Sequence, residues 1–190
     1  MKVPPAMVGS QPQRVLLLYS TINGHTLHIC ERLEQVIQGL GHKTTLKAMA
    51  QAQQLEVAQF DRVVIGASIR YGHHRPNVKA FIDQHCSALQ SRPSAFFSVN
   101  VVARKPHKAT PQGNPYARKF LQSLAWQPDL AAVFAGKLDY PSYDFFDRQM
   151  IRLIMWVTHG PTDPSAVVEF TDWAQVETFG RAFCALPSKP

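Results

Sequence analysis

Long apolar runs and cysteines are scarce in this sequence of 190 residues, and each scarcity excludes a class of protein. There is no run of about 18 apolar residues, so we expect no membrane-spanning helix. Three cysteines are present, Cys30, Cys86 and Cys184, and no two of them form a C-x-x-C pair. An odd number of widely spaced cysteines predicts reduced thiols in a cytosolic protein and argues against both a disulfide framework and a metal site.

Residues 1–13 lack the apolar stretch of about 7 to 15 residues that a signal peptide needs, and we expect them to form a flexible lead. Residues 14–187 are expected to form one domain, because a chain of this length buries enough surface without disulfides. Acidic residues are also few: 13 Asp and Glu against 20 Lys and Arg give a formal net charge of +7. This charge predicts an anionic partner: nucleic acid, an acidic membrane surface or an acidic small molecule.

Two well-known phosphate-binding motifs, G-x-x-x-x-G-K-S/T and G-x-G-x-x-G, are absent. A different candidate follows the apolar run 15–19, where small polar residues precede a helix expected to begin near Leu27. The first N–H groups of a helix lack partners and carry partial positive charge, so such a turn can hold a phosphate. A simple helix cap is the alternative, but a cap needs only one such side chain. The predicted phosphate-binding residues are Ser20, Thr21, Ile22, Asn23, Gly24, His25 and Thr26.

Apolar runs alternate with helical patterns along the rest of the chain. The runs predict five strands, at residues 15–19, 42–48, 61–68, 94–102 and 130–136. The intervening spacing predicts helices at about 27–40, 76–89, 117–124 and 173–186. This alternation implies an α/β fold with a parallel sheet covered by helices on both faces. We expect a flavodoxin-like sheet of order 2-1-3-4-5, and residues 21–26 resemble the T-x-T-G-x-T phosphate loop of flavodoxins.

Three loops must converge at the carboxyl ends of the strands of such a sheet: 20–26, 68–74 and 100–105. FMN needs a phosphate cradle, backbone groups for its polar ring edge and two walls for its flat ring, and these loops offer each part. We therefore predict FMN as the cofactor. The other predicted cofactor-binding residues are Ser68, Ile69, Arg70, Tyr71, Gly72, Ser98, Val99, Asn100 and Val101.

Basic and aromatic residues lie near the same edge and predict an acidic, flat substrate, because guanidinium groups match carboxylates. The candidate substrate contacts are Arg70, Tyr71, His73, Arg104 and Lys105, with His74 and Lys108 nearby. We expect no side chain to be essential for proton transfer, since a flavin carries most of the redox chemistry.

A long insert at about 140–168 separates the fifth strand from the last helix. Within it, residues 144–157 predict an amphipathic helix with a broad apolar side and a polar stripe of Asp144, Arg148 and Arg152. Three alternatives remain open: the apolar side packs on its own sheet, forms a subunit interface, or contacts an anionic membrane. A homo-oligomer is left open for the same reason.

Several blocks resemble one family, the flavodoxin-like, quinone-dependent protoporphyrinogen IX dehydrogenases of bacterial haem synthesis. They are VVIGASIRYGH at 63–73, PSAFFSVNVVARKP at 93–106, YARKFL at 116–121 and TDW at 171–173. The resemblance implies FMN-dependent oxidation of protoporphyrinogen IX, with menaquinone or ubiquinone as acceptor. It also implies a peripheral protein on the cytoplasmic side of the inner membrane.

Three rival functions belong to other classes: an electron-carrier flavodoxin, an NAD(P)H quinone reductase, and an anion- or nucleic-acid-binding module. Carrier flavodoxins are typically acidic, whereas this chain is basic. No nicotinamide motif is apparent. We therefore expect the dehydrogenase function, with no nucleic-acid partner.

Overall fold

The structure is a computed structural model that describes residues 11–189. Most of the expected flexible lead, residues 1–10, lies outside the described residues. Gln13, at the end of that segment, already contacts the fold, because its carbonyl accepts a hydrogen bond of 2.9 Å from the Lys43 N–H.

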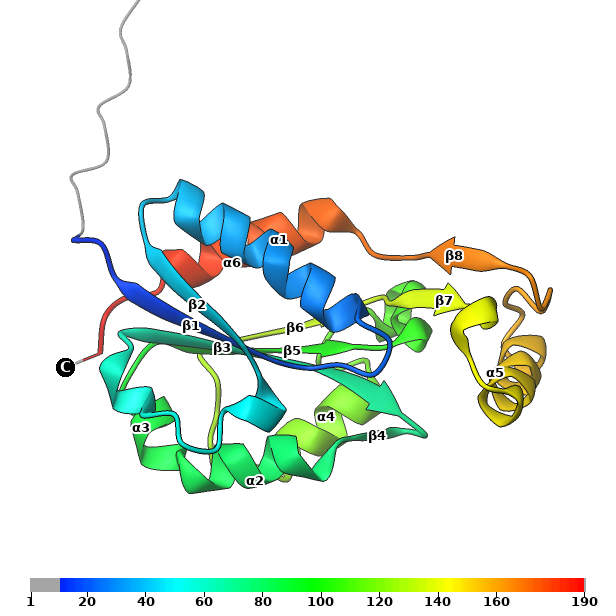
Figure 1. Cartoon of the computed structure of the whole chain (residues 1–190), viewed down its shortest axis with the longest axis horizontal. Coiled ribbons are helices and arrows are strands. Elements are labelled where there is room, and N and C mark those ends of the chain that lie inside the picture. The colour runs from blue at the N-terminus through cyan, green and yellow to red at the C-terminus, as the bar shows by residue number, and fades with distance from the viewer. Residues whose placement is uncertain (1–10, 190) are drawn as a thin grey trace, which may run out of the picture.

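Five parallel strands form the central sheet, in the order β2-β1-β3-β5-β6 (Figure 1). Their bounds are β1 Arg14–Ser20, β2 Lys43–Ala48, β3 Arg62–Arg70, β5 Ser94–Val99 and β6 Leu130–Phe134. A sixth, two-residue strand, β4 (His73–His74), pairs antiparallel with the end of β3. The predicted 2-1-3-4-5 order and the flavodoxin-like α/β class are confirmed, since the five long strands follow that order.

Helices cover both faces of the sheet, α1 and α6 on one side and α2, α3 and α4 on the other (Figure 1). Their bounds are α1 His25–Gly39, α2 Pro76–Gln84, α3 Cys86–Gln90, α4 Pro115–Gln122 and α6 Trp173–Cys184. The continuous apolar run of β1 serves both sides. Leu16 and Leu18 belong to the core beneath α2, whereas Val15 and Leu17 belong to the core beneath α1. Burial on both faces is what a parallel sheet between helix layers requires.

Several boundaries differ from the sequence prediction: the strand expected at 130–136 ends at Phe134, and the helix expected near Leu27 begins at His25. Three further differences have a local cause. The strand expected at 94–102 ends at Val99, because the Asn100 side chain accepts a hydrogen bond from the Ala103 N–H and caps a 3-10 helix, Val101–Arg104. The helix expected at 76–89 is broken at His85 into α2 and α3. Strand β3 runs on to Arg70, two residues past its expected end, because it pairs with β4.

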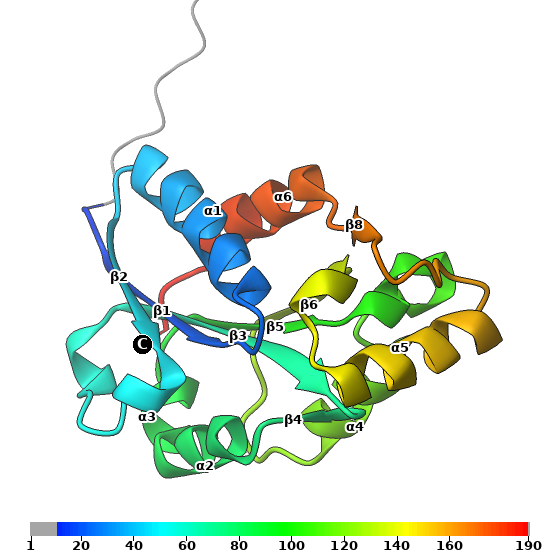
Figure 2. The ribbon, with the colours of Figure 1, turned by 45° about the vertical axis from the view of Figure 1, so that its right-hand side comes forward.

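The insert contains helix α5 (Phe145–Val157) and an unpredicted antiparallel pair, β7 (Lys137–Asp139) with β8 (Val167–Glu169). In Figure 2, α5 lies beyond the carboxyl ends of the strands. The remaining short 3-10 helices are Met49–Gln51, Val57–Gln59, Pro106–Lys108 and Tyr140–Ser142. The predicted helix at 144–157 is confirmed, with Asp144 as its N-cap.

Helix α5 packs against the rest of the insert through its polar side, and most of its apolar side faces away. Arg148 donates to the carbonyls of Tyr140 and Tyr143, at 3.1 and 3.0 Å, and Arg152 donates to that of Thr162 at 3.0 Å. The outer apolar side chains are exposed: Phe145, Phe146, Leu153, Trp156 and Val157. The alternative in which this side packs on its own sheet is therefore wrong for these five residues. Within the described part of the chain, no helix is both long and apolar enough to cross a bilayer.

Candidate functional site

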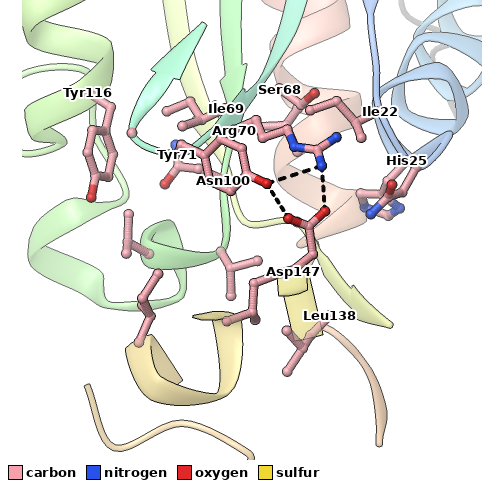
Figure 3. Close-up of a pocket in the computed structure, with 18 of the residues that line it drawn as sticks. Ile22, His25, Ser68, Ile69, Arg70, Tyr71, Asn100, Tyr116, Leu138 and Asp147 are labelled. Atoms are coloured by element: carbon pink, nitrogen blue, oxygen red, sulfur yellow. Dashed lines mark hydrogen bonds and ion pairs between the residues drawn. The ribbon is translucent and has the colours of Figure 1, made fainter. Parts of the chain in front are cut away.

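A cavity of about 760 Å³ lies at the carboxyl ends of β1, β3 and β5, with the insert as its opposite wall (Figure 3). All three loops that were expected to converge line it. The lining residues from these loops are Thr21, Ile22, Asn23, His25, Thr26, Ser68, Ile69, Arg70, Tyr71, Gly72, His73, Val99, Asn100, Val101 and Val102. The fold thus brings most of the predicted site residues together, although binding by each of them stays a prediction.

The turn between β1 and α1 leaves polar groups without partners. Gly24 precedes the helix at a φ of 79°, in the left-handed region that glycine adopts without strain, and no side chain caps the helix there. Three buried atoms, Ser20 Oγ, His25 Nδ1 and Thr26 Oγ1, make no hydrogen bond among residues 11–189. An unsatisfied buried polar group costs about 1–3 kcal/mol, so three at one turn indicate that a ligand completes them. Together with the unpartnered first N–H groups of α1, they fit a phosphate-bearing cofactor.

His25 has a more specific role at this turn. Its Nε2 lies 2.6 Å from the Thr171 hydroxyl, which donates its own proton to the Ala135 carbonyl at 2.9 Å. Nε2 must therefore donate, so that in the neutral ring Nδ1 is left as an acceptor. Burial lowers the pKa of His25, which favours that neutral ring. His25 is thus suited to accept a hydrogen bond from a ligand hydroxyl next to the phosphate.

A tight turn at the end of β3 aims two side chains at the insert. Tyr71 and Gly72 have φ values of 51° and 81°, as a two-residue hairpin between β3 and β4 requires. Arg70 lies over the Tyr71 ring at 5.0 Å and donates to Asp147 of α5 at 2.6 Å. The Tyr71 hydroxyl also donates to Asp147 (Figure 3). The hydrogen bond with Tyr71 is the main cause that raises the pKa of Arg70, so the guanidinium stays charged.

A buried polar network supports the third loop from below. His74 and Asn100 both hydrogen-bond to the Ser98 hydroxyl, at 3.0 and 3.3 Å, and Asn114 donates to Asn100 at 3.0 Å. Burial is the main cause that lowers the pKa of His74 to about 4, so its ring is neutral at physiological pH. The network fixes the position of Asn100, which is one of the lining residues of the cavity.

Several predicted residues do not line the cavity. Ser20 and Gly24 shape the phosphate turn from behind, and Ser98 belongs to the buried network. Arg104 also lies outside the lining, and its guanidinium donates to the Thr158 hydroxyl at 2.8 Å and to the Val101 carbonyl at 3.2 Å, so its predicted contact with substrate stays a prediction. Lys105, Lys108 and His74 also do not line it.

Sequence reasoning missed the wall that α4 and the insert supply. The additional lining residues are Pro115, Tyr116, Lys119, Gly136, Lys137, Leu138, Tyr143, Asp147, Met150, Ile151, Ile154 and Met155. Met150 and Ile154 fall on the apolar side of the predicted helix 144–157. That they line this cavity depends on how the insert packs against the sheet, which the sequence pattern does not give. Asp147 carries no sequence signal, since its partners Arg70 and Tyr71 are more than 70 residues away.

The cavity therefore has a polar end at the phosphate turn, an apolar middle and a basic rim of Arg70, His73, Lys119 and Lys137. Such a site suits a flat molecule with a phosphate at one end and an anionic, largely apolar second molecule.

Comparison with known proteins agrees with this geometry. A flavodoxin domain model matches residues 16–165. A protoporphyrinogen IX dehydrogenase (quinone) of Escherichia coli strain K12 is 46% identical over 177 residues, covering 93% of this chain and 98% of that protein. A protein of the same name from Leishmania major is 43% identical over 184 residues, covering 95% and 78%.

A solved structure shows the fold alone: oxidised Flavodoxin 1 from Bacillus cereus has a TM-score of 0.55 at 14% identity, covering 92% of this chain and 99% of its own. The sequence match extends through both the sheet and the insert. The chain therefore belongs to the flavodoxin domain family, in the group that contains the protoporphyrinogen IX dehydrogenases (quinone) of Escherichia coli and Leishmania major.

Proposed function

We propose that this protein is an FMN-dependent oxidoreductase of haem biosynthesis that oxidises protoporphyrinogen IX to protoporphyrin IX, with menaquinone or ubiquinone as acceptor. The observation that carries the proposal is the 46% identity, over 93% of the chain, to a protein named for this substrate and acceptor class. The cavity supports it independently, because it offers a phosphate turn and a basic, partly apolar wall at one site.

The phosphate turn supports FMN as the form of flavin. Thr26 and the first N–H groups of α1 would hold the phosphate, and His25 Nδ1 would accept from a hydroxyl beside it. Val99 and Ile69 would flank the ring. When bound, FMN supplies a two-electron acceptor and donor, which these side chains orient.

Conversion of the porphyrinogen to the porphyrin removes six electrons and six protons. Three quinones accept them and become three quinols, so the site must serve two apolar molecules in turn. The substrate also bears two carboxylates, for which Arg70 and Lys119 are the cations at hand, with His73 beside them as a further hydrogen-bonding side chain. A cavity of about 760 Å³ is in the upper part of the range of roughly 300–1,000 Å³ seen for ligand sites.

An electron carrier is the second candidate function, because the same fold is found in a solved flavodoxin. A carrier docks its partner at an open flavin edge, whereas here α5 covers that edge with Met150, Ile151 and Ile154. The net charge of +7 also differs from that of typical acidic carriers. These two features favour a protein with its own substrate.

The exposed side of α5 supports a peripheral position on the cytoplasmic side of the inner membrane. Its large apolar residues are uncovered in the monomer, and the chain is basic. Soluble monomers rarely expose such a patch without a binding role, and the positive net charge of the chain as a whole suits an anionic lipid surface. The quinone resides in that membrane, so the position would place acceptor and cavity together.

Anaerobic turnover tests the proposal. Protein reconstituted with FMN is mixed with protoporphyrinogen IX and a menaquinone, and porphyrin fluorescence is followed. We expect fluorescence to rise only when all three are present. Protein that binds FMN but forms no porphyrin would favour the carrier, and failure to bind FMN at all would contradict both functions.

A further inference from the structure

The N-terminal end of α5 is fastened to the sheet across the cavity by one charged contact, whereas Arg104 holds Thr158 at the C-cap of the helix. Asp147 Oδ2 lies 2.6 Å from Arg70 Nη2, and Asp147 also accepts from the Tyr71 hydroxyl. The hydrogen bonds of Arg148 and Arg152 remain within the insert. We call the three residues Arg70, Tyr71 and Asp147 the clasp.

Asp147 is the single carboxylate among the described residues that line the cavity. The cations there are Arg70, Lys119 and Lys137, and Lys137 is paired with Asp139 at 3.0 Å. The cavity is therefore basic overall, yet its one carboxylate, Asp147, is paired with Arg70. The guanidinium of Arg70 is the cation there that is best shaped to bind a carboxylate.

The clasp depends on strained backbone. Tyr71 has a φ of 51°, which is uncommon for a bulky residue and persists only where the surroundings enforce it. In this turn Arg70 and Tyr71 both donate to the same carboxylate, that of Asp147.

We propose that Asp147 is an internal substitute for a substrate carboxylate: a carboxylate of the incoming tetrapyrrole displaces it from Arg70 and Tyr71 and thereby releases α5. This inference rests on the proposed function, since it assumes a substrate with carboxylates. Exchange of one carboxylate for another keeps the guanidinium paired throughout. A neutral ligand must leave the clasp closed or leave two part-buried charges unpaired, so the clasp selects for acidic substrates.

The test compares Asp147→Asn with Asp163→Asn, a matched removal of one carboxylate from the same insert, outside the cavity. Binding of protoporphyrin IX and of its dimethyl ester to the FMN-loaded protein is measured by fluorescence. Hydrogen exchange of residues 145–157 is measured without any porphyrin. The wild type should prefer the diacid by about tenfold, the order expected for one charge-assisted contact.

Asp147→Asn should bind the diacid several-fold more tightly than the wild type and exchange faster over 145–157, whereas Asp163→Asn should match the wild type. Arg70→Ala should abolish the preference for the diacid. Unchanged or weaker diacid binding by Asp147→Asn would overturn the exchange, as would unchanged hydrogen exchange over α5. A wild type that loads FMN but neither binds nor oxidises porphyrins would overturn the proposed function instead, and the porphyrin-free exchange measurement keeps the two failures apart.

Discussion

The turn after β1 and helix α5 lie at the same end of the sheet. The turn has polar atoms without hydrogen-bond partners, whereas α5 has apolar side chains that no other part of the chain covers. At the turn, buried polar atoms of Ser20, His25 and Thr26 have no hydrogen-bond partner among residues 11–189. On α5, the side chains of Phe146 and Trp156 are 83% and 71% exposed. A few polar atoms without hydrogen-bond partners suit a small anionic ligand. Uncovered apolar side chains along a 13-residue helix suit an extended apolar surface instead.

The difference assigns two functions of one cavity, binding of the cofactor and admission of other molecules, to two separate segments of the chain. The turn belongs to the frame, and under the proposed function it selects the cofactor. The insert adds the apolar face and Asp147, and under the same proposal it controls what approaches that cofactor. Four measurements can break or sharpen this division, from the largest expected effect to the smallest.

The apolar side of α5 should carry the largest effect. Burying one large side chain contributes about 1.5–3 kcal/mol, so Phe146→Ser with Trp156→Ser should weaken binding to anionic vesicles by more than about 100-fold. Stability should change little, because both side chains are exposed. Co-sedimentation with vesicles measures the binding. Leu40→Ser, at the exposed apolar residue that follows α1, is the control and should bind as the wild type does.

A subunit interface is the alternative that this experiment also tests. If α5 joins two copies of the chain, sedimentation velocity should show a dimer that the double variant converts to a monomer. That result, with vesicle binding unchanged, would replace the membrane by a partner subunit.

The network around His74 differs from both regions, because this buried polar group has a hydrogen-bond partner within the chain, the Ser98 hydroxyl. The pKa of His74 is lowered to about 4 from 6.5, mainly by burial, so protonation favours the unfolded state. Its contribution is complete above pH 6.5 and is lost as the pH falls towards 4, by about 3 kcal/mol. Denaturant unfolding of the wild type and of His74→Gln should show a shallower pH dependence in the variant. Identical slopes would mean that His74 is not the buried proton acceptor.

Removing one unpartnered hydroxyl should affect the empty and the flavin-bound protein in opposite directions. Thr26→Val replaces a buried hydroxyl by a methyl group of similar size, so the apoprotein should gain about 1 kcal/mol of stability. FMN affinity should fall by roughly tenfold, because the phosphate loses a donor. Thr178→Val is the control, since the exposed Thr178 hydroxyl is already bonded to the Ala174 carbonyl at 2.8 Å. A loss of apoprotein stability would show that Thr26 has a partner without ligand.

The two glycines that flank α1 allow the smallest comparison. Gly24 and Gly41 have φ values of 79° and 89°, and an added Cβ would meet no atom within 4 Å at either. Alanine should therefore cost about 1 kcal/mol of stability at both positions through backbone strain alone. Only Gly24→Ala should also weaken FMN binding, as a titration of flavin fluorescence would reveal. Equal affinities in the two variants would remove the turn from the cofactor site.

The sheet could be predicted from the sequence because its information is local. The run Val15 to Tyr19 is apolar throughout, and parallel strands place their carboxyl ends at one edge whatever the details. The boundaries that differed depend on single side-chain contacts. Asn100 ends β5 by capping a 3-10 helix, and the pairing of β3 with β4 depends on the Tyr71–Gly72 turn.

The loop side of the site was predictable for the same reason, and the insert side was not. The composition of 144–157 indicated an amphipathic helix, but not that Arg148 and Arg152 would face inward to backbone carbonyls. Arg104 was predicted to contact substrate because it is basic and follows a strand whose carboxyl end lies at the site. Its partner, Thr158, is 54 residues away and could not be read from the sequence.

The two ends of the insert lie side by side on the frame. The Phe170 N–H donates to the Gly136 carbonyl at 3.1 Å, and the Thr171 hydroxyl donates to that of Ala135 at 2.9 Å. A segment that leaves and rejoins at neighbouring points can be shortened at little cost in loop closure. We expect a chain with a short Gly-Ser turn in place of residues 138–168 to keep its flavin and lose vesicle binding. The insert is in this sense a separable part of the fold, whereas the cations Arg70 and Lys119 would stay with the sheet when it is removed.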